Sequence, residues 1–249
     1  MAYNLTVSPD FAPDHISGWY FFNTWLQRQL EVGVHLELYD CFEKQRSDIR
    51  DNKVDMIYAN PYDASMLVRE LGFKAIARPQ ERPDETVIAV SAESSINSVE
   101  ELQAGITVAT TDDPDVHTMG MIMLEPADLD GSNVSTKEVD TYVIVAKNLL
   151  NGNADVGFFL KDAYDELSDL IKGQMKVLVS SQISVVHHSL LVGPTMQEFI
   201  PRLEERLFSM HEDEKGKGVL QSMNLEEWEP MTEEETEFMI DLIDTLVIE

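Results

Sequence analysis

The chain of 249 residues is 43% hydrophobic and 26% charged, which is typical of a globular protein. Its formal net charge of −28 argues against nucleic acid or anionic lipid as a partner, because proteins bind both through Lys and Arg. No apolar run approaches the roughly 20 residues that span a bilayer, and residues 1–5 lack the basic and apolar regions of a signal peptide.

The first third of the chain alternates strands and helices. Apolar residues at helical spacing predict a helix over residues 19–30, and a helix over 61–71 has Pro61 in its first turn, where a missing N–H costs nothing. The complete predicted order is strand 5–7, helix 19–30, strand 34–39, helix 42–52, strand 54–58, helix 61–71 and strand 73–77. This βαβαβ order indicates a parallel sheet with helices on both faces.

A second unit of the same kind follows. Ser98 is the expected N-cap of a helix, with Glu101 as its capping-box partner. Thr232 is expected to open the last helix, whose acidic first turn complements the helix dipole. The predicted elements are strand 86–90, strand 106–109, a helix through residues 120–123, helix 139–150, strands 177–179 and 190–192, and helices 196–207 and 232–246.

Residues 52–63 and 152–163 are two versions of one segment. Each contains a polar turn, an Asp, a short apolar strand and the start of a helix. We expect Asp55 and Asp155 to be structural, each at the start of a buried strand. The residues just past each strand differ between the copies and are better candidates for ligand contacts. The repetition predicts two similar lobes with a cleft between them.

The order of elements indicates that the chain visits one lobe, crosses to the other and returns. We predict that residues 1–85 and 188–249 form the first lobe and that residues 86–187 form the second. The crossings near residues 84–88 and 181–187 would make a two-strand hinge, which suits a clamshell that closes on a ligand.

In open parallel sheets, ligands bind at the carboxyl ends of strands and at helix N-termini. This rule selects residues 8–10, 39–41, 58–60 and 110–118, and the second copy of the repeat adds residues 158–162. No Lys or Arg lies between Arg82 and Lys137, so an anion there would need backbone N–H groups, hydroxyls or a His. The acids at positions 112, 113 and 115 either belong to this site or only cap the following helix.

The sequence offers little support for metal or covalent chemistry. Cys41 is single, which excludes a disulfide framework and a cysteine metal site. Strand alternation sends His187 and His188 to opposite faces, and a metal site from one of them with His117 and an Asp lacks any known spacing. The chain also lacks the GxSxG, Walker, GxGxxG and CxxC motifs. We therefore expect neither a metal nor a cofactor.

Several segments together resemble a known family. Residues 52–61, the helix at 98–102 before strand 106–110, residues 149–157 and the C-terminal return resemble the phosphate/phosphite/phosphonate-binding proteins of ABC importers. The resemblance covers nearly the whole chain and implies the type II periplasmic-binding-protein fold, an α/β clamshell whose two lobes are mainly parallel sheets flanked by helices.

The resemblance also implies binding residues. A Ser-Thr-Ser-Gly type turn that grips the phosphonate in the family corresponds here to residues 117–120, of which Thr118 and Gly120 fit. Tyr142 replaces a ligand-binding His, and Asp162 matches an acidic contact after the second repeat. An Asp that binds ligand amines falls near His187 or His188. The full set of expected ligand-binding residues is Tyr58, Asn60, Thr111, His117, Thr118, Tyr142, Asp162 and His188.

The resulting hypothesis is a solute-binding protein that captures a small anionic or polar ligand, a phosphonate-like oxyanion or related metabolite, in the inter-lobe cleft. Its partner would be an ABC-transporter permease or a sensor protein. The protein would be periplasmic or otherwise exported, since a chain from which the signal peptide had been removed would have the same sequence. A cytoplasmic location also stays open. The alternatives are an enzyme on the same fold and the ligand-sensing domain of a receptor. The sequence leaves the identity of the ligand and the oligomeric state open.

Overall fold

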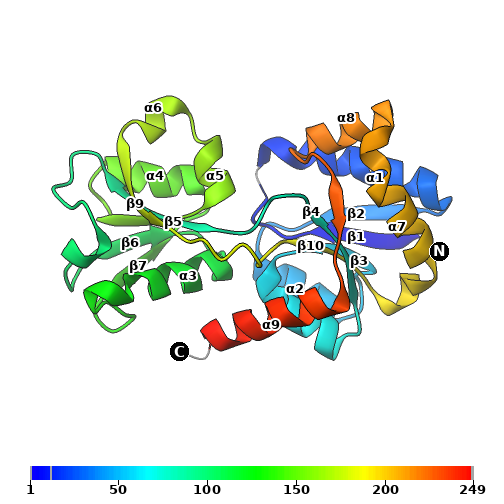
Figure 1. The fold of residues 1–249 in the computed structure, drawn as a ribbon, viewed down its shortest axis with the longest axis horizontal. Coiled ribbons are helices and arrows are strands. Elements are labelled where there is room, and N and C mark those ends of the chain that lie inside the picture. The colour runs from blue at the N-terminus through cyan, green and yellow to red at the C-terminus, as the bar shows by residue number, and fades with distance from the viewer. Residues whose placement is uncertain (1, 12, 248–249) are drawn as a thin grey trace. The chain divides into compact units, whose positions relative to one another are not determined.

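The computed structural model describes residues 2–11 and 13–247. Its contacts divide the chain into two compact units (Figure 1). The first unit comprises Met1–Arg82 and His187–Asp244, and the second comprises Pro83–Val186 and Thr245–Glu249. The two connecting segments are hydrogen-bonded to each other, since the Asp84 N–H donates to the Val186 carbonyl at 2.8 Å. No helix in the described part of the chain is long and apolar enough to cross a bilayer.

The first unit is built on a six-stranded sheet of order β11-β4-β10-β3-β1-β2. Strand β1 pairs in parallel with β2 and β3, whereas β10 is antiparallel to both β3 and β4, and β11 is antiparallel to β4. The strands are β1 (Tyr3–Val7), β2 (Val34–Leu38), β3 (Met56–Ala59), β4 (Lys74–Pro79), β10 (Ser189–Val192) and β11 (Trp228–Pro230).

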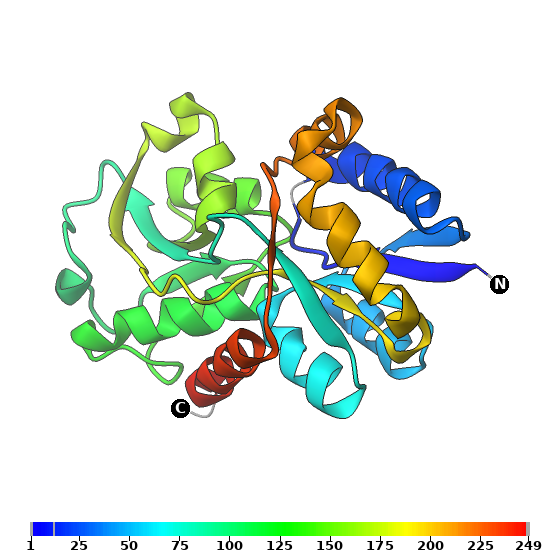
Figure 2. The same ribbon diagram turned by 45° about the vertical axis from the view of Figure 1, so that its right-hand side comes forward.

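Side chains that alternate along the strands of this sheet pack into two different hydrophobic cores. In β3, Met56 packs with one cluster and Ile57 with another, as a two-residue period requires. Helices α1 (Ile16–Leu30), α7 (Ile200–Phe208) and α8 (Glu214–Ser222) cover the first face, and α2 (Phe42–Arg50) covers the second (Figures 1 and 2). Helix α9 (Glu233–Val247) packs through Met239 and Ile240 on Ala64 and Met231.

The second unit has a five-stranded sheet of order β7-β6-β8-β5-β9 around one core. Strand β6 is parallel to β7 and β8, and β5 is antiparallel to β8 and β9. The strands are β5 (Thr86–Ser91), β6 (Thr107–Thr110), β7 (Ser135–Glu138), β8 (Val156–Leu160) and β9 (Met175–Ser180), and the helices are α3 (Pro114–Leu124), α4 (Tyr142–Leu150), α5 (Lys161–Glu166) and α6 (Asp169–Lys172).

The repeated segment has the same hydrogen bonds in both units. The Asp55 N–H donates to the Asn4 carbonyl at 2.9 Å, and the Asp55 side chain accepts the Asn4 N–H at 2.8 Å. Asp155 is bound to Thr107 in the same way, with the side-chain bond at 2.7 Å. Each Asp therefore ties the start of a buried strand to its parallel neighbour, and the predicted structural role is confirmed.

The structure differs from two of the local predictions. Residues 61–71 do not form one α-helix, because a 3₁₀ turn at Pro61–Asp63 leads into a π-helical turn at Met66–Glu70. The predicted capping box at Ser98 is wrong: Ser98 caps no helix, and the segment is a single 3₁₀ turn over Val99–Glu101. At Thr232 the predicted helix start is confirmed, since its hydroxyl accepts the Glu235 N–H at 3.2 Å.

Candidate functional site

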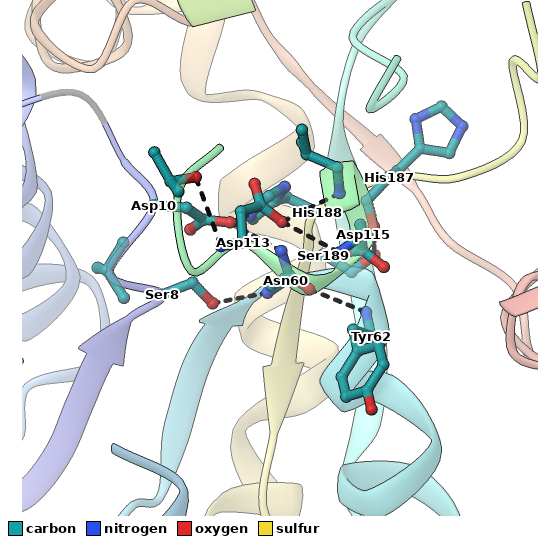
Figure 3. A network of polar contacts seen from close by, with 12 residues as sticks. Ser8, Asp10, Asn60, Tyr62, Asp113, Asp115, His187, His188 and Ser189 are labelled. Atoms are coloured by element: carbon teal, nitrogen blue, oxygen red, sulfur yellow. Dashed lines mark hydrogen bonds and ion pairs between the residues drawn. The ribbon is translucent and has the colours of Figure 1, made fainter. Parts of the chain in front are cut away.

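Polar residues gather where β1 and β3 of the first unit end and where β10 begins (Figure 3). The Ser8 N–H donates to the Tyr58 carbonyl at 2.9 Å, and the Ser8 hydroxyl accepts the Asn60 N–H at 2.6 Å. The Asn60 side chain in turn accepts the Tyr62 N–H at 3.0 Å. These bonds fix the chain just past both strands and hold Asn60, which is only 1% exposed, in a single orientation.

Asp10 is the centre of this cluster. Its Oδ2 accepts hydrogen bonds from Asn60 Nδ2 at 2.8 Å and from His188 Nε2 at 2.9 Å. Its side chain is only 3% exposed, and its Oδ1 has no hydrogen-bond partner among the described residues. Burial opposes ionisation of Asp10, but the charge of His188 and the bonds from His188 and Asn60 outweigh it and hold the pKa below the ordinary value.

Aromatic rings fix the position of His188. Its ring stacks on Tyr58 with the centroids 5.3 Å apart, and Tyr58 packs on Trp19 at 4.8 Å and on Trp228 at 5.9 Å. His187 lies on the other side of the chain, with Nδ1 3.2 Å from the Arg82 carbonyl oxygen. Figure 3 shows the two imidazoles pointing apart, so the predicted alternation is confirmed.

A buried ion pair lies near the same edge of the first unit. Arg46 Nε in α2 donates to Asp63 Oδ1 at 2.6 Å, and its guanidinium stacks on the rings of Phe42 and Tyr62. Burial raises the pKa of Asp63, although Arg46 and its hydrogen bond act in the opposite direction. The charge of Arg46 is therefore largely committed to Asp63.

In the second unit, the N-terminus of α3 is capped by an acid. Asp113 is 1% exposed, and its Oδ1 accepts the N–H groups of Asp115 at 3.2 Å and Val116 at 3.4 Å. Its Oδ2 accepts the Tyr142 hydroxyl at 2.9 Å, and its N–H donates to the Thr111 hydroxyl at 3.4 Å. The Asp113 carboxylate thus accepts the N–H groups that a helix N-terminus would otherwise offer to a bound anion.

His117 and Thr118 lie within α3, beyond its first residues. The His117 ring packs near Phe158, with the centroids 6.5 Å apart. Partial burial lowers the pKa of His117, although Glu138 acts in the opposite direction. Gly120 is required for packing, because a Cβ there would overlap the Phe158 ring.

The predicted binding residues fall into four groups. Asn60 and His188 bind Asp10, with the Tyr58 ring stacked on His188. Thr111 and Tyr142 bind Asp113, His117 and Thr118 lie further along α3, and Asp162 is half-buried in α5.

The prediction of binding residues omitted Asp10 and Asp113. Both lie in segments that the strand-end rule had selected. The signal for Asp113 was also in the sequence: an acid before Pro114 is a typical N-cap ahead of a proline at the first helical position.

The chain is similar to a family of transport proteins. A family profile described as ABC transporter, phosphonate, periplasmic substrate-binding protein matches residues 5–236. The fold is similar to PhnD1 from Prochlorococcus marinus in complex with methylphosphonate, with a TM-score of 0.85, 12% identity and coverage of 99% of this chain and 98% of that one. No curated protein sequence matches.

Two further solved structures have the same fold. A binding-protein component of an ABC phosphonate transporter from Pseudomonas aeruginosa has a TM-score of 0.79 at 16% identity, covering 98% of this chain and 87% of its own. XAC2383 from Xanthomonas citri, bound to ATP, has a TM-score of 0.80 at 14% identity, and the match covers 99% of this chain and 98% of that chain. The predicted fold class, that of the type II periplasmic binding proteins, is confirmed.

Proposed function

Since this chain belongs to the phosphonate-type periplasmic substrate-binding proteins of ABC transporters, it is a solute-binding protein, and we propose that the Ser8, Asp10, Asn60 and His188 cluster holds its small polar ligand. The family is a transporter component, so the ligand passes to a permease. We further propose that the protein is exported and acts by binding alone, without catalysis.

One observation supports this assignment above the others. The Asp10 carboxylate is buried and ionised at the carboxyl ends of the parallel strands, which is where open α/β sheets bind ligands. Buried carboxylates are costly unless hydrogen bonds satisfy both oxygens. In this cluster only Oδ2 has partners among the described residues, and we propose that a donor group of the ligand satisfies the buried Oδ1.

The neighbouring residues contribute rigidity. The Ser8 to Asn60 bond and the stacking of His188 on Tyr58 fix the donors around Asp10 before any ligand arrives. A preorganised site loses less side-chain entropy on binding, and that saving raises affinity. Tyr58, which is half-buried beside His188, would form an apolar wall of the site.

The test is a ligand screen by thermal shift, followed by isothermal titration calorimetry. The panel contains phosphonates, phosphite, phosphate, sulfonates, carboxylates, amino acids and simple amines at millimolar concentration. We expect at least one compound to raise the melting temperature, because a ligand that binds only the folded state stabilises it. If no compound in the panel binds, the proposed small-solute function is wrong.

Two adjacent histidines provide a matched pair of variants. His188→Gln removes the contact with Asp10 and is expected to weaken binding at least tenfold. His187→Gln alters a residue that faces Arg82 and is expected to bind like the unaltered protein. Equal loss in both variants would contradict the proposed site.

A further inference from the structure

A buried imidazole connects three parts of the first unit. The chain leaves this unit at Arg82 and returns to it at His187, which is 5% exposed. Arg78 Nη1 of β4 lies 3.1 Å from His187 Nε2, and His187 Nδ1 lies 3.2 Å from the Arg82 carbonyl oxygen. The backbone N–H of His187 donates to Met239 Sδ of α9 at 3.5 Å. His187 thus holds the returning chain against β4, the outgoing chain and α9.

The partners of His187 determine where its ring hydrogen lies. A guanidinium has only N–H donors, and a carbonyl oxygen only accepts. Nε2 must therefore accept the hydrogen bond from Arg78, and Nδ1 must carry the hydrogen that is donated to Arg82. A ring with one hydrogen is neutral. A second hydrogen, on Nε2, would point at the guanidinium and place two positive charges together in a buried position. The outgoing chain next to the accepting carbonyl carries Arg82 and Asp84, one charge of each sign.

His188, the next residue, has the opposite requirement. Its Nε2 lies 2.9 Å from Asp10 Oδ2, and an ionised carboxylate only accepts hydrogen bonds. The negative charge of Asp10 stabilises a protonated His188 ring, whereas the positive charge of Arg78 opposes protonation of His187. Figure 3 shows that the two rings point apart, so each responds to its own partner. Of the two histidines, His187 is therefore the one whose contacts are broken by mild acid.

Two acids face the Arg78 guanidinium. Its Nε lies 3.6 Å from Glu229 Oε2 of β11, and its Nη2 lies 3.5 Å from Glu235 Oε1 of α9. Hydrogen bonds from Thr232 lower the pKa of Glu235, and the nearby charges of Arg78 and a protonated His187 act in the same direction. Glu235 therefore stays ionised in mild acid and can hold the guanidinium when His187 no longer accepts its hydrogen bond.

We propose that His187 is a pH-sensitive latch on the returning chain. The neutral ring holds this chain on β4 and thereby positions His188 and the start of β10. A proton on Nε2 breaks the bond from Arg78, whose guanidinium turns to Glu229 and Glu235, and the returning chain is released. An imidazole titrates at about pH 6.5, so the latch is closed at neutral pH and opens in mild acid. The latch operates in the ligand-free protein and is independent of the proposed function.

Nitrogen-15 NMR of the imidazole side chains tests the tautomer in the unaltered protein. The spectrum is recorded at about pH 8, above the ordinary imidazole titration range, and the signal missing from His187→Gln identifies the residue. We expect His187 to carry its hydrogen on Nδ1 and to have an unprotonated Nε2. A hydrogen on Nε2 at this pH would contradict the latch, because Arg78 could then not donate to the ring.

Hydrogen exchange followed by mass spectrometry tests the opening. Protection factors, corrected for the intrinsic effect of pH, are compared at about pH 8 and about pH 5.5. In the unaltered protein, the protection of residues 186–192 is expected to fall roughly tenfold or more in acid. His187→Gln keeps both contacts, since its amide oxygen accepts from Arg78 and its amide nitrogen donates to the Arg82 carbonyl, but it does not titrate. Its protection is therefore expected to change less than about twofold.

Two further variants complete the comparison. His35→Gln alters an exposed histidine of β2 that pairs with Glu37, and it should keep the full acid response. Arg78→Met removes the donor but keeps the side-chain stem, so the latch is open at both pH values and the acid response should be lost. Melting temperatures at neutral pH confirm that the variants fold.

Three results would overturn the latch. The first is no fall of protection in the unaltered protein, and the second is an equal fall in His187→Gln. The third is a full acid response in folded Arg78→Met, or the loss of that response in His35→Gln, since either would place the titrating group elsewhere.

Discussion

Asp10 illustrates how three neighbours keep one buried carboxyl ionised. Without them, removal from water would favour the neutral acid. The hydrogen bonds from Asn60 and His188 and the charge of His188 reverse that preference. The same bonds hold the ends of β1 and β3 against the start of β10, so the group proposed to bind ligand also stabilises the first unit.

This coupling predicts a dependence of stability on pH. The folded pKa of Asp10 is below the ordinary value of 3.8, so its contribution is complete above that pH and is lost as the pH falls through the folded pKa. Asp10→Asn lacks this contribution. The free energy of unfolding, measured by urea titration from neutral pH to about pH 2, should therefore differ most between the two proteins near neutrality and converge in acid. A difference that stays constant with pH would contradict this account.

Tyr142 is expected to stabilise the α3 cap through its hydrogen bond to Asp113. Tyr142→Phe removes the 2.9 Å bond to Asp113 and should lower the free energy of unfolding by about 1 kcal/mol. Urea titration measures the change. Tyr164→Phe is the control, because the structure shows no hydrogen bond for that hydroxyl among the described residues, and its effect should stay within about 0.5 kcal/mol. If both variants lowered the free energy of unfolding equally, the proposed stabilisation of the α3 cap by Tyr142 would be contradicted.

Helices α1 and α8 approach each other closely at one glycine. A Cβ at Gly18 would overlap the backbone carbonyl of Ser222, which cannot move as a flexible side-chain end can. The close contact brings Phe22 and Leu26 of α1 into one core with Leu220 of α8. Gly18 is therefore a packing requirement, in contrast to Gly218, which has open space around it.

The two glycines form a matched pair for mutagenesis. Gly18→Ala should lower the free energy of unfolding by about 1–3 kcal/mol, because overpacking forces the two helices apart. Gly218→Ala should be neutral or should stabilise by up to about 1 kcal/mol, because Ala favours a helix. Thermal and urea unfolding test both variants, and a stabilised Gly18→Ala protein would show that the contact is not tight.

The sequence predicted most elements and the repeated segment because periodicity and short local motifs specify them. Asp55 and Asp155 could be assigned from residues close in sequence. Strand β7 was missed because all four of its residues are exposed and show no alternation. The Asp10 cluster was only partly predicted, since it joins residues from three distant strand ends, and single-sequence patterns do not show which side chains meet there.

The two units have separate hydrophobic cores. All buried residues of one cluster lie between Val87 and Met175, whereas the others belong to the first unit. Each core is connected to the rest of the chain through the crossings near residues 82–84 and 186–187. Multi-domain chains of this kind need not unfold in one two-state step.

Core truncations should act on one unit at a time. Leu149→Ala and Leu220→Ala each remove a buried side chain and should cost about 2–5 kcal/mol. Hydrogen exchange followed by mass spectrometry should show lost protection mainly in Pro83–Val186 for the first variant and mainly in the first unit for the second. Equal loss of protection in both units would mean that the molecule unfolds as one cooperative body.

The antiparallel strand β10 has a consequence for how the protein is made. It lies between β3 and β4, and it enters the chain only after the whole of Pro83–Val186. During translation, β4 has no strand beside it until Ser189–Val192 and then Trp228–Pro230 leave the ribosome. The second unit, which is continuous through its sheet and helices, can complete its fold first, as domains do during synthesis. While the second unit is being synthesised, the nascent first unit therefore has an exposed sheet edge. Exposed edge strands are the feature of a sheet most prone to non-native strand pairing.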